Sequence, residues 1–472
     1  MPNKILPSVL VFSLLSACAS APDLGPKPVP AAVESFESSA SFADAGGAWP
    51  IEGWWQGFGD VQLDTLIGEG LAGSPDIATA AARVRAAESM AQQAGAALLP
   101  RVGAEGGAGG VQQSKNMGIP PQFVPEGIQD TGHVAATFSF DLDLWGKNRA
   151  ALAAATSEAE AARVDAAQAR LMLTTGIASA YADLAGYYQA LDVANEAVRV
   201  RGASADVSAK RAAAGIENQS AERQATSRTA AARGDVAALE EAIATTRNRL
   251  AALVGAGPDR GLAITRPTLE GPAMGLPPQA GIDLIGRRPD VVAARLRAEA
   301  AAKRIDVARA DFYPNINLSA LVGLQSLGLS NLFKSGSEYG NGGVAVSLPI
   351  FDGGRLQGRY RGARADYDIA VANYDRTLIA ALRDVADIVA SRSATARQLA
   401  ERREALKAAT EAAQLAGMRY RAGLSNQLPQ LTAEDSMTQL ARQVSDLEAR
   451  KLSLDIALIR ALGGGYQTKT GE

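Results

Sequence analysis

Residues 132–145 read GHVAATFSFDLDLW, and apolar and polar side chains alternate along most of this stretch. One parity carries the apolar set Val134, Ala136, Phe138, Phe140, Leu142 and Leu144. The other carries His133, Thr137, Ser139, Asp141 and Asp143. Because successive side chains of a strand point to opposite faces of a sheet, the stretch predicts a strand at about 132–144 with one apolar face and one wet face.

Three further segments are predicted to be strands. Residues 315–324 and 342–350 alternate in the same way, whereas 101–113 contains five glycines, which weaken a strand interior. Strands of about ten residues with one apolar and one polar face are typical of outer-membrane β-barrels. A soluble β-sandwich would show the same alternation, so this pattern alone leaves both architectures open.

The chain also contains an internal duplication. Pro289 follows Pro75 by 214 positions, and Pro314 follows Pro100 by the same interval. Later landmarks keep an interval of 208, with Gly354 after Gly146 and Gly423 after Gly215. We therefore predict two copies of one unit, at 61–259 and 282–466, joined by a linker at 260–281 and followed by a tail at 467–472.

Long helices are predicted around the strands of each copy. Pro-Asp pairs start helices at 75–97 and 289–311, where Pro suits the first turn and Asp favours the helix dipole. From Gly146 to Ala214 the chain lacks proline and has coiled-coil spacing, for example at Ile177, Tyr181 and Leu184. At about 1.5 Å per residue that helix is on the order of 100 Å long. Shorter return helices are predicted at about 222–253 and 432–462.

Composition excludes several kinds of function. The formal net charge of −3 gives no reason to expect nucleic acid, and a single Cys with a single His excludes an intrachain disulfide and a Cys/His zinc site. His133 lies on the wet parity and is interpreted as solvated, and Asp141 and Asp143 are interpreted as lining water. With no catalytic constellation, we predict neither an enzyme nor a cofactor or metal.

The amino terminus is predicted to carry an export signal. Lys4 precedes an apolar run, Ile5–Ala17, that is too short to span a bilayer as a helix. Leu15-Ser16-Ala17-Cys18 resembles the bacterial lipoprotein processing box. That resemblance implies a signal peptide at 1–17, covalent lipid (diacylglyceryl and palmitate) on Cys18, and outer-membrane sorting by Ala19. The lipid-anchored segment 18–60 would begin as an extended tether to about Pro50.

Four strands are too few to close a barrel, since about eight is the minimum and an open edge in lipid leaves backbone groups unpaired. Closure therefore requires several chains. Two chains would supply eight strands and three would supply twelve, and the strand count alone leaves this choice open.

Several motifs together resemble the TolC-like outer-membrane efflux channel family, specifically its lipoprotein branch. They are the segments Trp54–Asp60, Arg287–Asp290, Phe312–Pro314, Phe351–Arg355, Arg419–Gly423 and Ala461–Gly465. The resemblance implies a mainly α-helical homotrimer with a twelve-stranded barrel in the outer membrane and an α-helical tunnel in the periplasm. It also implies a passive exit duct in multidrug resistance, served by an inner-membrane transporter and a periplasmic adaptor.

The same resemblance places a gate at the periplasmic tip, at the helix turns of Gly215 and Gly423. The gate candidates near these turns are polar or acidic: Glu217, Asn218, Glu222, Ser425, Asn426, Thr432, Glu434 and Asp435. Thr432 stands where the family usually has Asp, and Pro429 is unusual. For Glu434 and Asp435 the alternative is that they stabilise the dipole of a helix beginning beside them.

A lipid-anchored coiled coil or adhesin without a pore is the alternative function. The paired strands inserted at matching places in both copies argue against it, because a fibre has no use for them. The sequence does not identify the exported compounds, the transporter or the adaptor.

Overall fold

The computed structural model describes residues 21–37, 40–42, 46–216, 218–271, 275–278 and 280–467. Cys18, the signal peptide at 1–17, the gate candidate Glu217 and most of the 467–472 tail lie outside the described residues. The chain divides into two compact units. The first contains 1–30, 84–161 and 294–374, and the second contains 31–83, 162–293 and 375–472, so each draws on both sequence copies.

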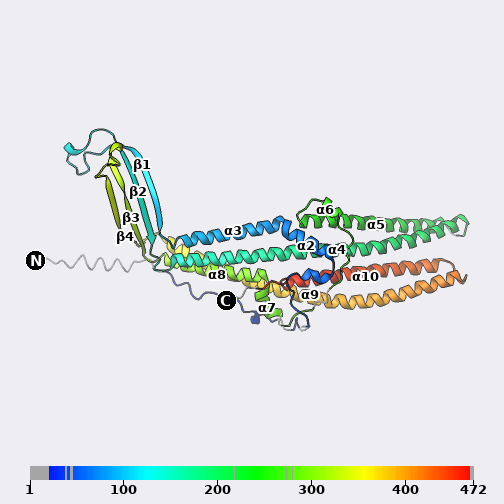
Figure 1. The fold of residues 1–472 in the computed structure, drawn as a ribbon. Coiled ribbons are helices and arrows are strands. Elements are labelled where there is room, and N and C mark those ends of the chain that lie inside the picture. The colour runs from blue at the N-terminus through cyan, green and yellow to red at the C-terminus, as the bar shows by residue number, and fades with distance from the viewer. Residues whose placement is uncertain are drawn as a thin grey trace. The chain divides into compact units, whose positions relative to one another are not determined.

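The first unit contains a four-stranded antiparallel sheet of order β1-β2-β3-β4 (Figure 1). The strands are β1 (Arg101–Val111), β2 (Gln129–Asp141), β3 (Asn315–Leu327) and β4 (Glu338–Ser347). Short 3-10 turns lie in the connections, η3 (Pro121–Phe123) and η4 (Leu329–Asn331). The glycine-rich segment is thus a strand. At one position, Gly107, the crowding by a neighbouring side chain explains why a glycine is present. A Cβ at Gly107 would lie 2.7 Å from Cε1 of His133 on the neighbouring strand.

The strand limits differ from the predicted ones at several ends. β2 begins at Gln129 and ends at Asp141, rather than at 132 and 144. It ends early because Asp143 accepts hydrogen bonds from the backbone N–H groups of Asn148 and Arg149, at 2.8 and 2.9 Å, and so caps the following helix. β4 runs from 338 to 347 rather than from 342 to 350, and stops before Pro349, which has no N–H for a ladder.

The strand register places the apolar parities of all four strands on one face. Phe138 of β2 lies opposite Val102 of β1 and Ala320 of β3, and Ile316 of β3 lies opposite Val346 of β4. This apolar face is exposed in the isolated chain, with Val102, Val322 and Val346 at 75%, 69% and 65% exposure. The opposite face is mainly polar and carries His133, Thr137, Ser139, Asn317, Ser319 and Asn341.

The helices next to the sheet are α3 (Pro75–Ala96), α4 (Lys147–Ala213), α8 (Pro289–Ala310) and α9 (Arg355–Arg421). Within the first unit, Ala301 and Ile305 of α8 pack against Tyr367 and Val371 of α9. No described helix has the combination of length and apolar character that crossing a bilayer requires.

The predicted tether is held along α9 within the first unit. Residues 21–32 have no helix or strand, and Arg364 donates hydrogen bonds to the carbonyl oxygens of Gly25 and Pro26. The Tyr367 hydroxyl donates to the Pro28 carbonyl oxygen at 2.8 Å. Residues 21–32 are therefore extended and contact α9 from Gly25 onward.

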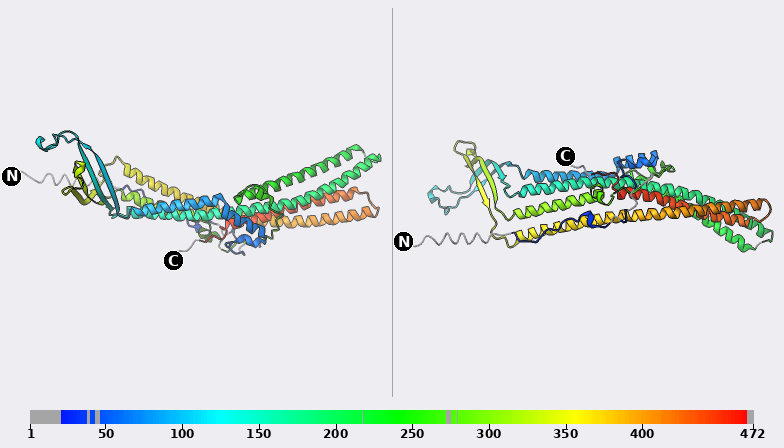
Figure 2. Two further views of the ribbon diagram at one scale, coloured as in Figure 1. Left: turned by 45° about the horizontal axis from the view of Figure 1, so that its top comes forward. Right: turned by 90° about the horizontal axis from the view of Figure 1, so that it is seen from below.

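The second unit contains two helical hairpins. α5 (Gln219–Leu253) runs back along the C-terminal half of α4, and α10 (Leu428–Ala461) runs back along that of α9 (Figures 1 and 2). The shorter elements are η1 (Val33–Ser35), η2 (Trp54–Phe58), α2 (Val61–Gly73), α6 (Asp259–Leu262) and α7 (Ala280–Arg287). The apolar seam is buried as predicted, since Ile177, Tyr181 and Leu184 are each 0% exposed.

Asp60 ties the N-terminal segment of the second unit to the helices. Its carboxylate is 6% exposed and accepts hydrogen bonds from the Tyr181 hydroxyl at 2.9 Å and from the Thr268 backbone N–H at 2.8 Å. It also caps α2 by accepting from the N–H groups of Gln62 and Leu63. Burial acts to raise the Asp60 pKa, but these hydrogen bonds outweigh it and hold the pKa below the usual range.

Replacing Asp60 with Asn should lower the free energy of unfolding by about 1–3 kcal/mol at pH 7. The amide NH2 group would take the place of a carboxylate oxygen, so one donor would face the donors of Tyr181 and Thr268. The Asp60 pKa is lower in the folded state than in the unfolded state. Its contribution is therefore complete above the unfolded pKa of about 4 and is lost as pH falls through the folded pKa.

Thermal unfolding followed by circular dichroism at pH 7, 5 and 3 checks this prediction. The loss of stability of Asp60→Asn relative to the wild type should be smaller at pH 3 than at pH 7. The matched control is Asp206→Asn, at an exposed position of α4, which should unfold like the wild type. A deficit that stays constant down to pH 3 would contradict the linkage.

Candidate functional site

The two hairpin turns have the same backbone geometry. Gly215 and Gly423 both have φ of 70°, which is left-handed. The N–H of Ile216 donates to the Arg211 carbonyl oxygen and that of Gly215 to the Ala212 carbonyl oxygen, at 2.9 and 3.0 Å. Leu424 and Gly423 repeat this pair of bonds onto Arg419 and Tyr420. This is the Schellman motif, which satisfies the last carbonyls of a helix and requires a residue that tolerates positive φ.

The first-copy gate candidates lie at the start of α5. The Asn218 side chain is the N-cap and accepts a hydrogen bond from the Ala221 N–H at 3.2 Å. Glu222 lies in the first turn of the same helix, where its charge favours the helix dipole. Both residues therefore have a local structural role in beginning the return helix.

The second-copy candidates lie where α10 begins. Asn426 accepts a hydrogen bond from the Leu428 N–H at 3.2 Å, and the Thr432 hydroxyl donates to the Leu428 carbonyl oxygen at 2.9 Å. Ser425 lies in the turn between these helices and is half-buried. The polar groups of this turn are thus mostly engaged with nearby backbone.

The helix containing Glu434 and Asp435 begins earlier than predicted. α10 starts at Leu428 rather than at about 432, with Pro429 in its first turn, so its first turn carries no acidic residue. Proline favours this early start because its ring fixes a helical φ and its missing N–H costs nothing there. The dipole interpretation of Glu434 and Asp435 is therefore wrong, since the effect falls off beyond the first turn.

Asp435 instead bridges the two hairpins. Its carboxylate pairs with Nε of Arg201 on α4 at 2.9 Å, with side-chain exposures of 30% and 22%. It also accepts a hydrogen bond from Gln439, while Glu434 accepts one from Gln430 at 2.9 Å. Nothing in the sequence pattern marked Arg201, because its partner is 234 residues away and on another helix.

A second ion pair lies beside the Arg201–Asp435 pair on α4. Arg199 donates to both carboxylate oxygens of Glu196, at 2.8 and 2.5 Å. The hydrogen bond to Glu196 raises the pKa of Arg199, and Glu434 adds a smaller attraction in the same direction. Arg199, Arg201, Glu434 and Asp435 together form a charged contact between the hairpins.

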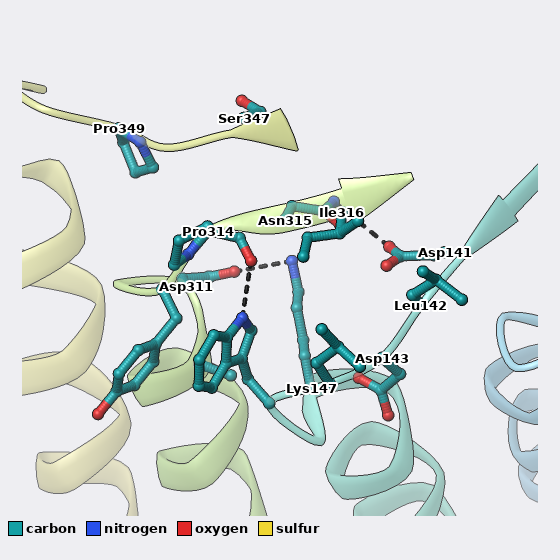
Figure 3. A pocket seen from close by; sticks show the side chains of 14 residues that line it. Asp141, Leu142, Asp143, Lys147, Asp311, Pro314, Asn315, Ile316, Ser347 and Pro349 are labelled. Atoms are coloured by element: carbon teal, nitrogen blue, oxygen red, sulfur yellow. Dashed lines mark hydrogen bonds and ion pairs between the residues drawn. The ribbon is translucent and has the colours of Figure 1, made fainter. Parts of the chain in front are cut away.

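The other predicted polar residues lie at the sheet. Asp141 accepts a hydrogen bond from Asn315 at 3.3 Å, and Lys147 pairs with Asp311 at 2.7 Å (Figure 3). These residues line a cavity of about 110 Å³ where the strands end. His133 lies on the polar face of the sheet, distant in sequence from any hairpin turn. Within the described residues no cluster of His, Cys, Asp or Glu is arranged to hold a metal ion.

Comparison with known proteins identifies the family. The family model for outer membrane efflux proteins matches residues 66–256 and 282–464. The chain belongs to the outer membrane efflux protein family. The two matched segments lie within the two predicted copies, and membership places the chain in the outer membrane as an efflux component.

Related proteins cover the chain almost end to end. The multidrug resistance outer membrane protein MdtP of Escherichia coli is 33% identical over 99% of this chain and 98% of its own length. The crystal structure of the outer membrane protein VceC of Vibrio cholerae matches with a TM-score of 0.83 and 40% identity, over 89% of this chain and 100% of VceC. The structure of the outer-membrane channel OprN matches with a TM-score of 0.83 and 26% identity, over 95% and 99%. All three are outer membrane proteins or channels by name, and together with the family model they confirm the TolC-like resemblance of the sequence.

Substitution of Gly423 by Ala should destabilise the tip of the second hairpin by about 1–2 kcal/mol, because Ala at φ of 70° brings Cβ close to a carbonyl oxygen. Gly417 lies six residues earlier within α9, and a Cβ there meets only ordinary contacts at 3.6 Å. Gly417→Ala should therefore stabilise the helix by about 0.5–1 kcal/mol.

Amide hydrogen exchange of the 415–430 segment measures both changes. Faster exchange in Gly423→Ala together with slower exchange in Gly417→Ala supports the turn geometry. Equal effects of the two substitutions would contradict it.

Proposed function

We propose that three copies of this chain form a passive outer-membrane duct, with a twelve-stranded barrel that continues into a periplasmic tunnel of helices. The observation that carries the proposal is the sheet. β1 and β4 each have a single neighbouring strand, and the apolar face is exposed. In hydrocarbon the unpaired edges must be joined to strands of other copies. Twelve strands leave a lumen, whereas eight are filled by side chains.

The helix that continues the β1 edge supports the same assembly. α3, which leads into β1, has no buried residue along its 22 positions. Its counterpart in the second copy, α8, buries Val291, Val292, Ala301 and Ile305 at 4% exposure or less. Two equivalent helices therefore differ in partners, and a neighbouring copy would give α3 the contacts that α8 already has.

The duct serves a tripartite pump in this proposal. Its cargo is drugs or other small molecules, in keeping with the name of the relative MdtP, a multidrug resistance protein. An inner-membrane transporter supplies the energy and a periplasmic adaptor joins it to the hairpin turns. Ile216 and Leu424, at equivalent positions of the two turns, are 67% and 71% exposed and offer apolar contacts there. Covalent lipid on Cys18 anchors the amino terminus in the same membrane.

The purified protein should run as a trimer in detergent and conduct ions in planar bilayers. Conductance should appear in integral steps, one for each inserted trimer. Analytical ultracentrifugation with detergent correction and single-channel recording measure both properties. A monodisperse monomer without conductance would overturn the duct and favour the anchored coiled coil.

The Arg201–Asp435 pair closes the periplasmic end in this proposal. It joins α4 to α10, so separation of the two hairpins breaks it. The pair is partly exposed and so contributes modestly, in the range of roughly 1 kcal/mol per subunit. Three such pairs in a trimer would hold the duct shut and still release it when an adaptor binds.

Asp435→Asn should raise the time-averaged conductance several-fold, because it removes the charge that Arg201 faces. The matched control is Asp446→Asn, an exposed position on the same helix, and it should conduct like the wild type. The charge swap Arg201→Asp with Asp435→Arg should restore closure. Single-channel recording at low and high salt measures these effects. A wild-type conductance for Asp435→Asn would remove the pair from the gate.

A further inference from the structure

A groove of about 640 Å³ opens in the first unit where the strands meet the helices. It lies between the first turns of α4 and the last turns of α8. Its basic lining residues are Arg149, Lys303 and Arg309, and its acidic one is Asp306. The groove is separate from the hairpin turns that hold the gate candidates, and its lining residues lie outside the four strands.

The groove has an excess of positive charge. Arg149 is engaged with Asp143 at 3.3 Å. Lys303 and Arg309 are exposed and have no ion-pair partner in the part of the chain that the structure describes. Asp306, the one acid of the lining, lies between them on α8, three residues from each, so the lining keeps an excess of positive charge. Such a surface attracts an anion.

Aromatic side chains form one end of the groove. Trp145 and Tyr313 stack with ring centroids 4.8 Å apart and an interplanar angle of 20°. The Trp145 indole N–H donates to the Pro314 carbonyl oxygen at 2.7 Å, which fixes the pair. Both rings are only partly covered, at 50% and 41% exposure. Partly exposed Trp and Tyr of this kind are enriched where a membrane meets water.

The groove also borders the apolar side of the sheet. Leu144, which lines it, is 58% exposed and continues the apolar parity of Phe138, Phe140 and Leu142. The ladder itself reaches this point, since the Leu142 N–H donates to the Ile316 carbonyl oxygen at 2.9 Å. Apolar surface therefore lies on the strand side of the aromatic pair and basic surface lies on the helix side.

A second copy of the chain is not positioned to cover this surface. The groove lies where β2 leads into α4 and where α8 leads into β3, and these are the two central strands. Copies that join through the free edges would meet at β1 and β4 instead. The groove accordingly stays open in an assembly closed through those edges.

We propose that the groove binds an anionic phospholipid of the membrane leaflet at this end of the strands. The lipid phosphate contacts Lys303 and Arg309, the glycerol region lies against Trp145 and Tyr313, and the acyl chains run along Leu144 toward the apolar face. Juxtamembrane basic pockets recognise anionic headgroups in this way. The inference rests on the proposed function, because it requires the strands to lie in a membrane.

Native mass spectrometry of the delipidated, detergent-solubilised full-length protein tests the site. Titration with phosphatidylglycerol and with phosphatidylethanolamine of the same acyl chains should show preferential binding of the anionic lipid. The double variant Lys303→Gln with Arg309→Gln should weaken phosphatidylglycerol binding by roughly tenfold or more. The charge-retaining variant Lys303→Arg with Arg309→Lys should bind like the wild type.

The matched control is Arg402→Gln with Lys407→Gln, which removes two exposed cations from α9 in the second unit. It should leave lipid binding unchanged. Equal losses in the groove and control variants, or no preference of the wild type for phosphatidylglycerol, would overturn the inference. Competition by inorganic phosphate at concentrations comparable to the lipid would also overturn it, because the groove would then be a free-anion site.

Conductance recorded on the same preparations separates this inference from the proposed function. Trimers that conduct normally but lack lipid preference would refute the lipid site alone. Selective lipid binding by a protein that never conducts would refute the duct and leave the groove as a membrane contact. Retained trimer mass in the groove variant shows that lost binding does not come from misfolding.

Discussion

Backbone hydrogen bonding at the two open sheet edges is the constraint on which the rest of the structure depends. A strand with one neighbour leaves half of its N–H and C=O groups without partners, and hydrocarbon supplies none. The register adds a second constraint, because it collects the apolar side chains of all four strands on one exposed face. A surface of this kind is stable where lipid covers the face and other strands cover the edges. The helices show a similar need for a neighbour, because α3 has no buried residue in the isolated chain.

The two copies share a plan but differ in detail where their partners differ. In both hairpins the outgoing helix ends in the same Schellman motif, at Gly215 and at Gly423. The return helices begin differently, with an Asn218 cap in the first copy and Pro429 in the first turn of the second. α10 begins at Leu428, so Asp435 lies in its second turn, and there it meets Arg201. The two copies thus share the turn that ends the outgoing helix and differ in the residues that begin the return helix.

The polar and charged groups of the molecule differ in how deeply they are buried. The buried Asp60 network stabilises the second unit, whereas the Arg201–Asp435 pair is partly exposed and contributes little energy. In the proposed duct this difference is useful, because the frame would have to hold while the proposed closing contact would have to release. The groove beside Trp145 belongs to a third class, since its cations Lys303 and Arg309 are exposed and would gain partners only from outside the chain in the proposed lipid site.

The sequence by itself determined the elements, because their signals are local. Period-two alternation marked β2, and proline-free heptad spacing marked α4. The family followed from motifs such as Phe351–Arg355 and Arg419–Gly423. Helix and strand ends moved by a few residues where a cap such as Asp143 or a proline such as Pro429 decided them.

Only the tertiary structure decided which distant residues meet. The common apolar face depends on the pairing register, Arg201 meets Asp435 across 234 residues, and the groove joins Arg149 to Lys303. No local pattern encodes such contacts, because they are fixed by how helices and strands pack after they form.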